Sequence, residues 1–150
     1  MKNLLLIFDT NVYVHTFGAS KKPPCVTLLS LAAGSPPKYS IRIPRLIVEE
    51  VKRNLIPEIF REFMGFISEL TSIDENSVIS FELGAKYEAK GLKPADSFIA
   101  AYTEWTGADA LVTENRHFLS RRADLPFKVF TAEACLKFLI AASRSKKAHR

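Results

Sequence analysis

The sequence contains few cysteines, and none of them has a metal-ligand partner at close spacing. Its two cysteines, Cys25 and Cys135, lie far apart, and neither has a second Cys or a His at the spacing of a zinc site. We therefore interpret both as buried thiols, as is usual in the reducing cytosol. A single disulfide between them is the alternative interpretation.

Long hydrophobic segments and glycine-rich phosphate loops are also missing. The longest early apolar run, residues 4–8, is bounded by Lys2 and Asp9 and is much shorter than the ~20 residues of a membrane span. We therefore expect a cytoplasmic protein with no membrane partner. The missing phosphate loop argues against a nucleotide-binding fold.

The excess of positive charge is confined to one end of the chain. The net charge is +5, and Arg144, Lys146, Lys147 and Arg150 supply four of these charges. Without these four, residues 1–142 contain 17 of the 21 basic residues and all 16 acidic ones. We predict one domain over residues 1–142 and a basic, disordered tail over residues 143–150, which gives only weak support to a polyanion partner.

The pattern of apolar residues predicts an α/β domain. The 150 residues are 47% hydrophobic and 25% charged, which is typical of one globular domain. Short apolar runs alternate with segments of helical periodicity, and this alternation indicates an α/β sandwich around a mainly parallel sheet. The expected strands are residues 4–8, 39–43, 77–81, 110–113 and 129–130. The expected helices are one that follows Asp9, residues 26–33, 46–55, 57–70, 82–90 and 96–105, and one that Thr131 caps.

The helix over residues 57–70 carries an unusual number of aromatic residues on one stripe. Its apolar positions repeat with a period near 3.6, from Ile59 to Leu70. Core packing is the interpretation that such a stripe favours. A surface for a protein partner is the alternative.

Acidic and amide side chains follow the expected strands at the points where active sites of parallel sheets form. Asp9 directly follows the first strand, and Thr113, Glu114 and Asn115 end or follow a later one. Each acid alone has a structural interpretation, as a helix cap or a solvated residue. Asp9, however, adjoins a buried apolar strand, where an unpaired charge is costly.

Two further acids come from helices near the same edge. They are Glu50, in the helix after the second strand, and Asp96, at the start of another helix. Clustered carboxylates repel one another, and a hard divalent cation such as Mg²⁺ or Mn²⁺ would compensate that repulsion. The sequence therefore predicts a site for phosphate-ester chemistry at this edge.

Four segments of the sequence resemble the successive motifs of PIN-domain nucleases. They are residues 8–12 (FDTNV), 48–51 (VEEV), 94–101 (PADSFIAA) and 108–118 (ADALVTENRHF). They occur in the family's order and extend over most of the chain. The family includes the toxin halves of VapBC toxin-antitoxin pairs.

This resemblance implies a three-layer α/β/α sandwich with about five parallel strands, and metal-dependent hydrolysis of RNA. Asp9, Glu50 and Asp96 match the family's acids and would hold Mg²⁺ or Mn²⁺, and Thr113 and Asn115 match the final motif. The family often has Asp where Asn115 stands, so Asn115 is expected to orient water or substrate, and Glu114 is the candidate for a substitute acid. Thr10 and Asn11 of the first motif are further candidates. An antitoxin protein and a homodimer are the partners implied besides RNA.

Several alternatives stay open from the sequence. A catalytically weak PIN-like module that binds RNA or protein is one, because Asn115 brings no charge. A phosphatase of the haloacid dehalogenase type is another, although it needs a second acid where Asn11 stands. Glu49 competes with Glu50 for the second acidic position, and His117 is either a ligand or a structural residue.

Overall fold

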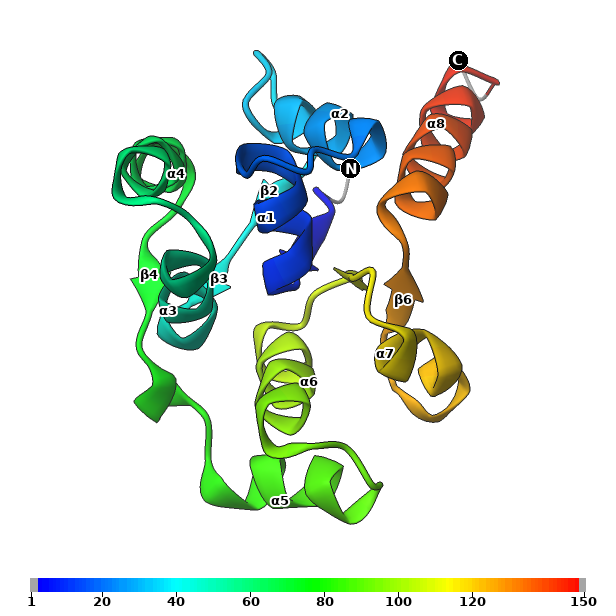
Figure 1. Cartoon of the computed structure of the whole chain (residues 1–150). Helices are drawn as coiled ribbons and strands as arrows, with labels where there is room; N and C mark the ends of the chain where they lie inside the picture. Colours follow the sequence, from blue (N-terminus) through cyan, green and yellow to red (C-terminus); the bar gives the residue numbers. More distant parts are fainter. Residues whose placement is uncertain (1–2, 149–150) are drawn as a thin grey trace.

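A computed structural model describes residues 3–148 and has a central sheet of parallel strands (Figure 1). The sheet order is β2-β1-β5-β6, and every neighbouring pair is parallel. Its strands are β1 (Leu5–Phe8), β2 (Ser40–Ile41), β5 (Ala110–Val112) and β6 (Lys128–Phe130). The expected α/β class is thus confirmed, although the sheet has four strands where we predicted about five.

The strand sequences explain why this sheet lies in the middle of the molecule. In β1, Leu6, Ile7 and Phe8 are at most 1% exposed, and all of β5 is fully buried. Strands covered on both faces are expected to be continuously apolar rather than alternating. The continuous apolar run at residues 4–8 is therefore what a strand in the middle of a parallel sheet requires.

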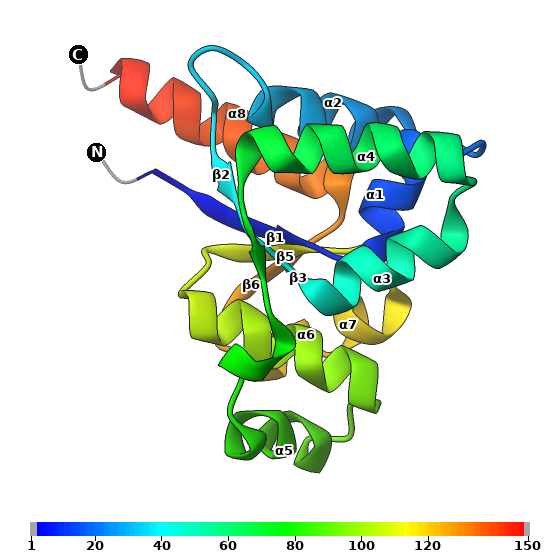
Figure 2. The same ribbon diagram turned by 90° about the vertical axis from the view of Figure 1, so that its left-hand side faces the viewer.

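Helices cover both faces of the sheet and complete three layers. In Figure 2, α1, α2, α4 and α8 lie on one side of the strands, and α5, α6 and α7 lie on the other. The helices are α1 (Thr10–Phe17), α2 (Pro23–Ala32), α3 (Arg45–Asn54), α4 (Pro57–Leu70), α5 (Phe81–Ala89), α6 (Pro94–Thr106), α7 (Arg116–Ser120) and α8 (Ala132–Ala148).

The expected strand over residues 39–43 divides between two sheets. Its first part is β2, and β3 (Ile43–Pro44) instead pairs with β4 (Ile73–Asp74) in a separate two-stranded sheet. Pro44 has no N–H to donate, which suits the end of a short strand at the margin of the fold. Only the first part of the expected strand therefore belongs to the main sheet.

The strand predicted at residues 77–81 is wrong. A 3₁₀ helix, η1 (Asn76–Val78), occupies that region, and the true strand, β4, precedes it. Ser80 belongs to the next helix, because its hydroxyl accepts a hydrogen bond from the Leu83 backbone N–H at 3.2 Å and caps α5. A second 3₁₀ helix, η2 (Arg122–Asp124), was not predicted either.

The aromatic stripe of α4 packs into the core. Phe63 and Ile67 are fully buried, and Phe63 has edge contacts with Tyr13 at 5.2 Å and Phe17 at 5.7 Å between ring centroids. Phe66 also contacts Phe17. Core packing is therefore the observed role of this stripe.

The C-terminal helix extends further than the sequence suggested. Thr131 caps α8 as expected, since its hydroxyl accepts a hydrogen bond from the Ala134 N–H at 3.1 Å. The helix continues to Ala148, so up to that residue the segment predicted as a disordered tail is helical. The described side chains do not include those of the charged tail residues Lys146, Lys147 and Arg150.

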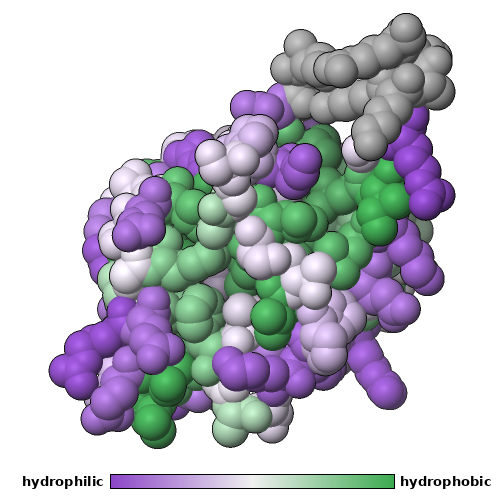
Figure 3. All heavy atoms as spheres, turned by 90° about the horizontal axis from the view of Figure 1, so that it is seen from above, coloured by the Kyte–Doolittle hydropathy of each residue, from purple (hydrophilic) through white to green (hydrophobic). Residues whose placement is uncertain are grey.

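A hydrophobic groove lies between α2 and α8. Figure 3 shows hydrophobic side chains in the middle of the face seen from above Figure 1, with hydrophilic ones around them. The groove has a volume of about 320 Å³ and is lined by Leu4, Leu31, Lys38, Leu139, Ile140, Ala142 and Ser143.

Both cysteines are buried and free, as the sequence predicted. No helix within residues 3–148 is long and apolar enough to cross a bilayer.

Candidate active site

The register of β1 and β5 brings two polar residues together at the carboxyl edge of the sheet. Phe8 pairs with Val112, so Asp9 and Thr113 each follow the last paired residue. The Asp9 N–H donates to the Val112 carbonyl at 2.9 Å, and the Thr113 N–H donates to that of Phe130, also at 2.9 Å. The backbone thus fixes the starting point of both side chains.

Asp9 is a nearly buried carboxylate held by hydrogen bonds. Its residue is only 5% exposed. One oxygen accepts from the Thr10 backbone N–H at 2.8 Å, which caps α1, and the other accepts from the Thr113 hydroxyl at 2.7 Å. The Asn115 N–H in turn donates to that hydroxyl at 2.9 Å. These contacts leave Asp9 one orientation, toward the space beyond the sheet.

Glu50 reaches the same space from α3. Its carboxylate accepts a hydrogen bond from the Thr10 hydroxyl, which links it to the residue after Asp9. Asn54, one helical turn later, donates its side-chain amide to the Glu50 carbonyl at 2.8 Å. Glu49 is exposed and outside the pocket described next, so the geometry favours Glu50 over its neighbour.

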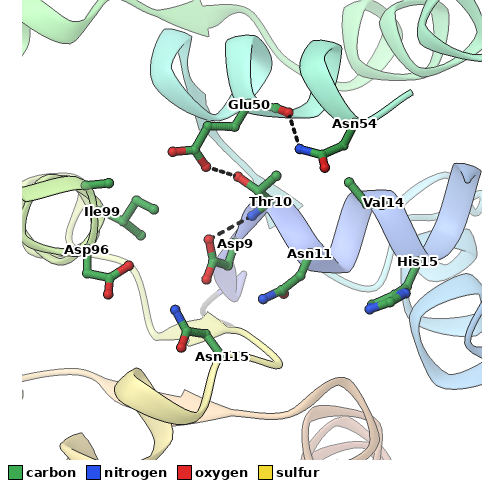
Figure 4. Close-up of a pocket in the computed structure, with 11 residues that line it drawn as sticks. Asp9, Thr10, Asn11, Val14, His15, Glu50, Asn54, Asp96, Ile99 and Asn115 are labelled. Atoms are coloured by element: carbon green, nitrogen blue, oxygen red, sulfur yellow. Dashed lines mark hydrogen bonds between the residues drawn. The ribbon is translucent and has the colours of Figure 1, made fainter. Parts of the chain in front are cut away.

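Asp9, Glu50, Asp96 and Asn115 line one pocket of about 290 Å³ (Figure 4). Asp96 enters from the first turn of α6, which Pro94 begins. The acids therefore come from three different elements, as the sequence predicted for their positions. The full lining consists of Asp9, Thr10, Asn11, Val14, His15, Glu50, Asn54, Ala95, Asp96, Ile99 and Asn115.

Burial dominates the electrostatics of Asp9. Desolvation raises the pKa of its carboxyl from 3.8 to about 6, although the hydrogen bonds from Thr113 and Thr10 oppose the rise. The negative charges of Asp96 and Glu50 are smaller causes of the same rise. At neutral pH the ionised Asp9 carboxylate therefore lowers the stability of the folded protein.

The pKa of the Asp96 carboxyl is also raised. Burial raises the pKa of its carboxyl, His117 and Lys93 lower it by their charge, and Glu50 raises it again. Among the side chains that the structure describes, no salt bridge reaches Asp9, Glu50 or Asp96. The pocket thus has an excess of negative charge that nothing within it neutralises.

In the loop after β5, the Asn115 side chain lines the pocket and the Glu114 side chain does not. The Asn115 side-chain oxygen caps α7 by accepting from the His117 N–H at 2.9 Å, and Figure 4 shows its amide nitrogen turned toward Asp9. The Glu114 carboxylate instead accepts from the Ala132 N–H at the start of α8, at 3.2 Å. Glu114 is not among the lining residues. Neither is His117, which is exposed on α7.

Asn11 and Thr113 position neighbouring groups. The Asn11 side-chain oxygen accepts the Glu114 N–H at 3.1 Å, which ties the start of α1 to the loop after β5. Thr113 is fully buried and orients Asp9, as described above, although it does not line the pocket. The site is therefore braced across two strands by backbone and side-chain contacts.

The chemistry of the pocket fits a hard cation, but its acids are not gathered into one coordination sphere. Among the described residues, no group of three or more His, Cys, Asp or Glu side chains is arranged to hold a metal ion. Carboxylate and amide oxygens are nevertheless the ligands that Mg²⁺ takes, and Mg²⁺ commonly uses one or two carboxylates and keeps several waters. An uncompensated, nearly buried Asp9 beside two further acids fits such a cation.

Sequence reasoning missed two polar residues of the pocket, His15 and Asn54. Both lie four residues after a predicted site residue, His15 after Asn11 and Asn54 after Glu50. Residues at i and i+4 lie on the same face of a helix. That spacing was the signal that could have identified them.

Comparison with known proteins shows the fold. No known family model matches the sequence, and no curated protein matches it. The solved structures similar to the chain in fold include VapBC2 from Rickettsia felis bound to a DNA fragment from their promoter, and FitAcB from Neisseria gonorrhoeae. The matched chains have TM-scores of 0.55 and 0.57 and identities of 19% and 16%. Each alignment covers 85% of this chain and 97% of the other.

These similarities agree with the motifs at the level of architecture. This chain has a parallel sheet in the order β2-β1-β5-β6 with helices on both faces, and its fold matches that of these structures. The protein therefore has the PIN-type α/β fold that its four sequence motifs indicated.

Proposed function

We propose that this protein is a Mg²⁺- or Mn²⁺-dependent ribonuclease that acts as the toxin of a toxin-antitoxin pair. One observation carries the proposal: Asp9, Glu50 and Asp96, from three separate elements, line one pocket at the carboxyl edge of a parallel sheet. No salt bridge among the described residues compensates these acids. Acids placed in this way suit the binding of a divalent cation and a phosphodiester.

The three acids would hold the cation directly or through its bound waters, and the other residues would orient them and the substrate. A bound divalent cation would supply a Lewis acid for the phosphate and lower the pKa of water. Thr113 and Thr10 hold the Asp9 and Glu50 carboxylates through their hydroxyls. The Asn115 amide nitrogen would donate a hydrogen bond to the substrate phosphate or to water, because its side-chain oxygen already caps α7.

Cleavage of single-stranded RNA tests this proposal. The wild type should cleave in Mn²⁺ or Mg²⁺ and not in EDTA. Asp9→Asn, Glu50→Gln and Asp96→Asn should each lower the rate about 100-fold or more, as expected when a group acting on the developing charge is lost. Glu49→Gln is the matched control on the same helix and should cleave like the wild type.

Either of two outcomes would defeat the proposed chemistry. Cleavage that survives both Asp9→Asn and Asp96→Asn would show that another site carries the activity. Tight RNA binding without metal-dependent turnover would identify the protein as a PIN-like binding module instead.

An antitoxin would act by covering this pocket. A second groove, of about 560 Å³, adjoins it through the shared residue Asn54 and is lined by apolar residues of α1 and α4 and the segment after α3, among them Phe17, Ile56 and Ile59. Ile56 is 62% exposed. A small protein encoded beside this one should suppress cleavage, and Ile56→Glu should relieve that suppression. Light scattering of the free protein would test the expected homodimer.

A further inference from the structure

His15 lies on the wall of the acidic pocket but belongs to none of the groups that would hold a cation. It projects from α1, and Figure 4 places its ring at the end of the pocket away from Asp96, beyond Asn11. Between Thr10 and His15 the helix rises about 7.5 Å along its axis. His15 therefore faces a different part of a bound strand from the part that meets the acids.

The ring of His15 is oriented by the segment that follows α1. Its Nδ1 lies 3.0 Å from the Ser20 backbone carbonyl oxygen. The His15 carbonyl accepts the Lys22 N–H at 2.9 Å, and the Lys21 ammonium donates to the Thr16 carbonyl at 2.8 Å. The histidine is thus held at both its side chain and its backbone.

The partner of Nδ1 decides what the other ring nitrogen can do. A carbonyl oxygen only accepts hydrogen bonds, so Nδ1 must carry the proton in this contact. In the neutral ring, Nε2 is then an acceptor with a lone pair directed away from Ser20. A phosphate oxygen is also an acceptor and does not satisfy this atom, whereas a hydroxyl group does.

We propose that His15 Nε2 accepts a hydrogen bond from a ribose 2′-hydroxyl and makes the pocket selective for RNA over DNA. The inference rests on the proposed function for its ligand, a single-stranded nucleic acid, and adds the feature by which that ligand is recognised. The 2′-hydroxyl is the group by which proteins tell RNA from DNA at a given position. His15 therefore contributes to specificity, while the acids serve the chemistry.

Binding measured in EDTA tests this without any cleavage. The probes are a fluorescent single-stranded RNA and its 2′-deoxy counterpart with the same bases, titrated with the wild type, His15→Asn, His15→Gln and His117→Asn. The wild type should prefer RNA by about 2- to 12-fold, the range for one hydrogen bond between neutral groups. His15→Asn keeps a polar atom for Ser20 but none at the place of Nε2, so the preference should disappear while DNA binding is unchanged.

The other variants separate recognition from general effects. The Gln side chain can place an acceptor oxygen near the position of Nε2, so His15→Gln should retain part of the preference. His117 is exposed and does not line the pocket, so His117→Asn should leave the RNA-to-DNA ratio unchanged. A set of RNAs with one 2′-deoxy position each should contain one that lowers wild-type affinity by the full factor. This last measurement needs no variant to fold.

The results distinguish this inference from the proposed function. Equal affinity of the wild type for RNA and DNA, or an equal loss for both with His15→Asn, would overturn the role of His15 even if the protein cleaves RNA. A selective loss of RNA binding without metal-dependent cleavage by the wild type would support His15 and defeat the nuclease.

Discussion

Asp9 is a nearly buried acid and Asp74 a partly buried one, and their charges are balanced in opposite ways. Asp74, in β4, accepts two hydrogen bonds from Arg42, at 3.0 and 3.1 Å, and one from the Tyr102 hydroxyl. Burial raises the pKa of Asp74, but these partners outweigh it and lower the pKa below its usual value. Asp9 has only uncharged partners, and the pKa of its carboxyl is about 6.

The contrast separates a structural acid from a candidate functional one. The Arg42 guanidinium, which also lies 4.9 Å from the centre of the Trp105 ring, completes the Asp74 site within the fold. Tyr102 extends that site to α6, so it ties the small sheet to the rest of the domain. The Asp9 site has no such positively charged partner among the described residues. Strongly shifted acids that lack an internal counter-ion are candidates for function for this reason.

Asp9→Asn should give the largest change in stability, and in the favourable direction. A rise in pKa from 3.8 to about 6 corresponds to roughly 3 kcal/mol at neutral pH, since each unit is worth about 1.4 kcal/mol. The wild type loses this much stability as the pH rises from 3.8, the pKa of Asp9 in the unfolded chain, through about 6, its pKa in the folded protein. The reason is that the folded state binds the proton more tightly. Urea unfolding at pH 8 in EDTA should therefore show the variant to be more stable, with the gain vanishing below about pH 4. A destabilised variant at pH 8 would contradict the comparison.

Asp74→Asn should have the opposite sign. It removes the negative charge to which Arg42 and Tyr102 donate hydrogen bonds. Loss of a hydrogen bond to a charged group costs about 1.5–3 kcal/mol. The folded pKa of Asp74 is lowered, so its contribution is present above the unfolded value of 3.8 and is lost as pH falls through the folded pKa. The same urea experiment should show a deficit at pH 7 that shrinks in acid. A deficit that does not change with pH would mean that the charge is not the cause.

Glu114→Gln should have the smallest effect. The Gln side chain can still accept the Ala132 N–H, so only the favourable charge at the start of α8 is lost, about 0.3–1 kcal/mol. RNA cleavage should stay within a factor of two or so of the wild type, since the group is outside the pocket. A large loss of cleavage would restore Glu114 as a substitute for the acid that Asn115 lacks.

Much of the fold could be predicted because single residues mark its elements. The apolar run before Asp9, Pro57 and Pro94 at helix starts, and Gly107 after α6 all gave correct boundaries within a few residues. Gly107 has a positive φ of 70°, the left-handed conformation that ends helices. These signals are local and act through the backbone, so sequence alone carries them.

The errors arose where pairing partners decide the structure. β2 and β3 are two residues each, and Arg42 alone separates them, so nothing local distinguishes one strand from two. Asn115 looked like a weakened acid, but its oxygen caps α7, a helix of five residues that was not predicted. The grouping of Asp9, Glu50 and Asp96 followed from topology, whereas the position of Glu114 depended on a side-chain direction that no short motif encodes.

Direct titration of Mn²⁺ into the protein tests the central claim. Calorimetry should detect binding to the wild type and to Glu49→Gln with similar affinity, and affinity for Asp96→Asn should fall at least by the roughly 10–100-fold that loss of an outer-shell partner costs a metal site. If Asp9→Asn and Asp96→Asn bind Mn²⁺ as tightly as the wild type, the three acids do not form a metal site and the account is wrong.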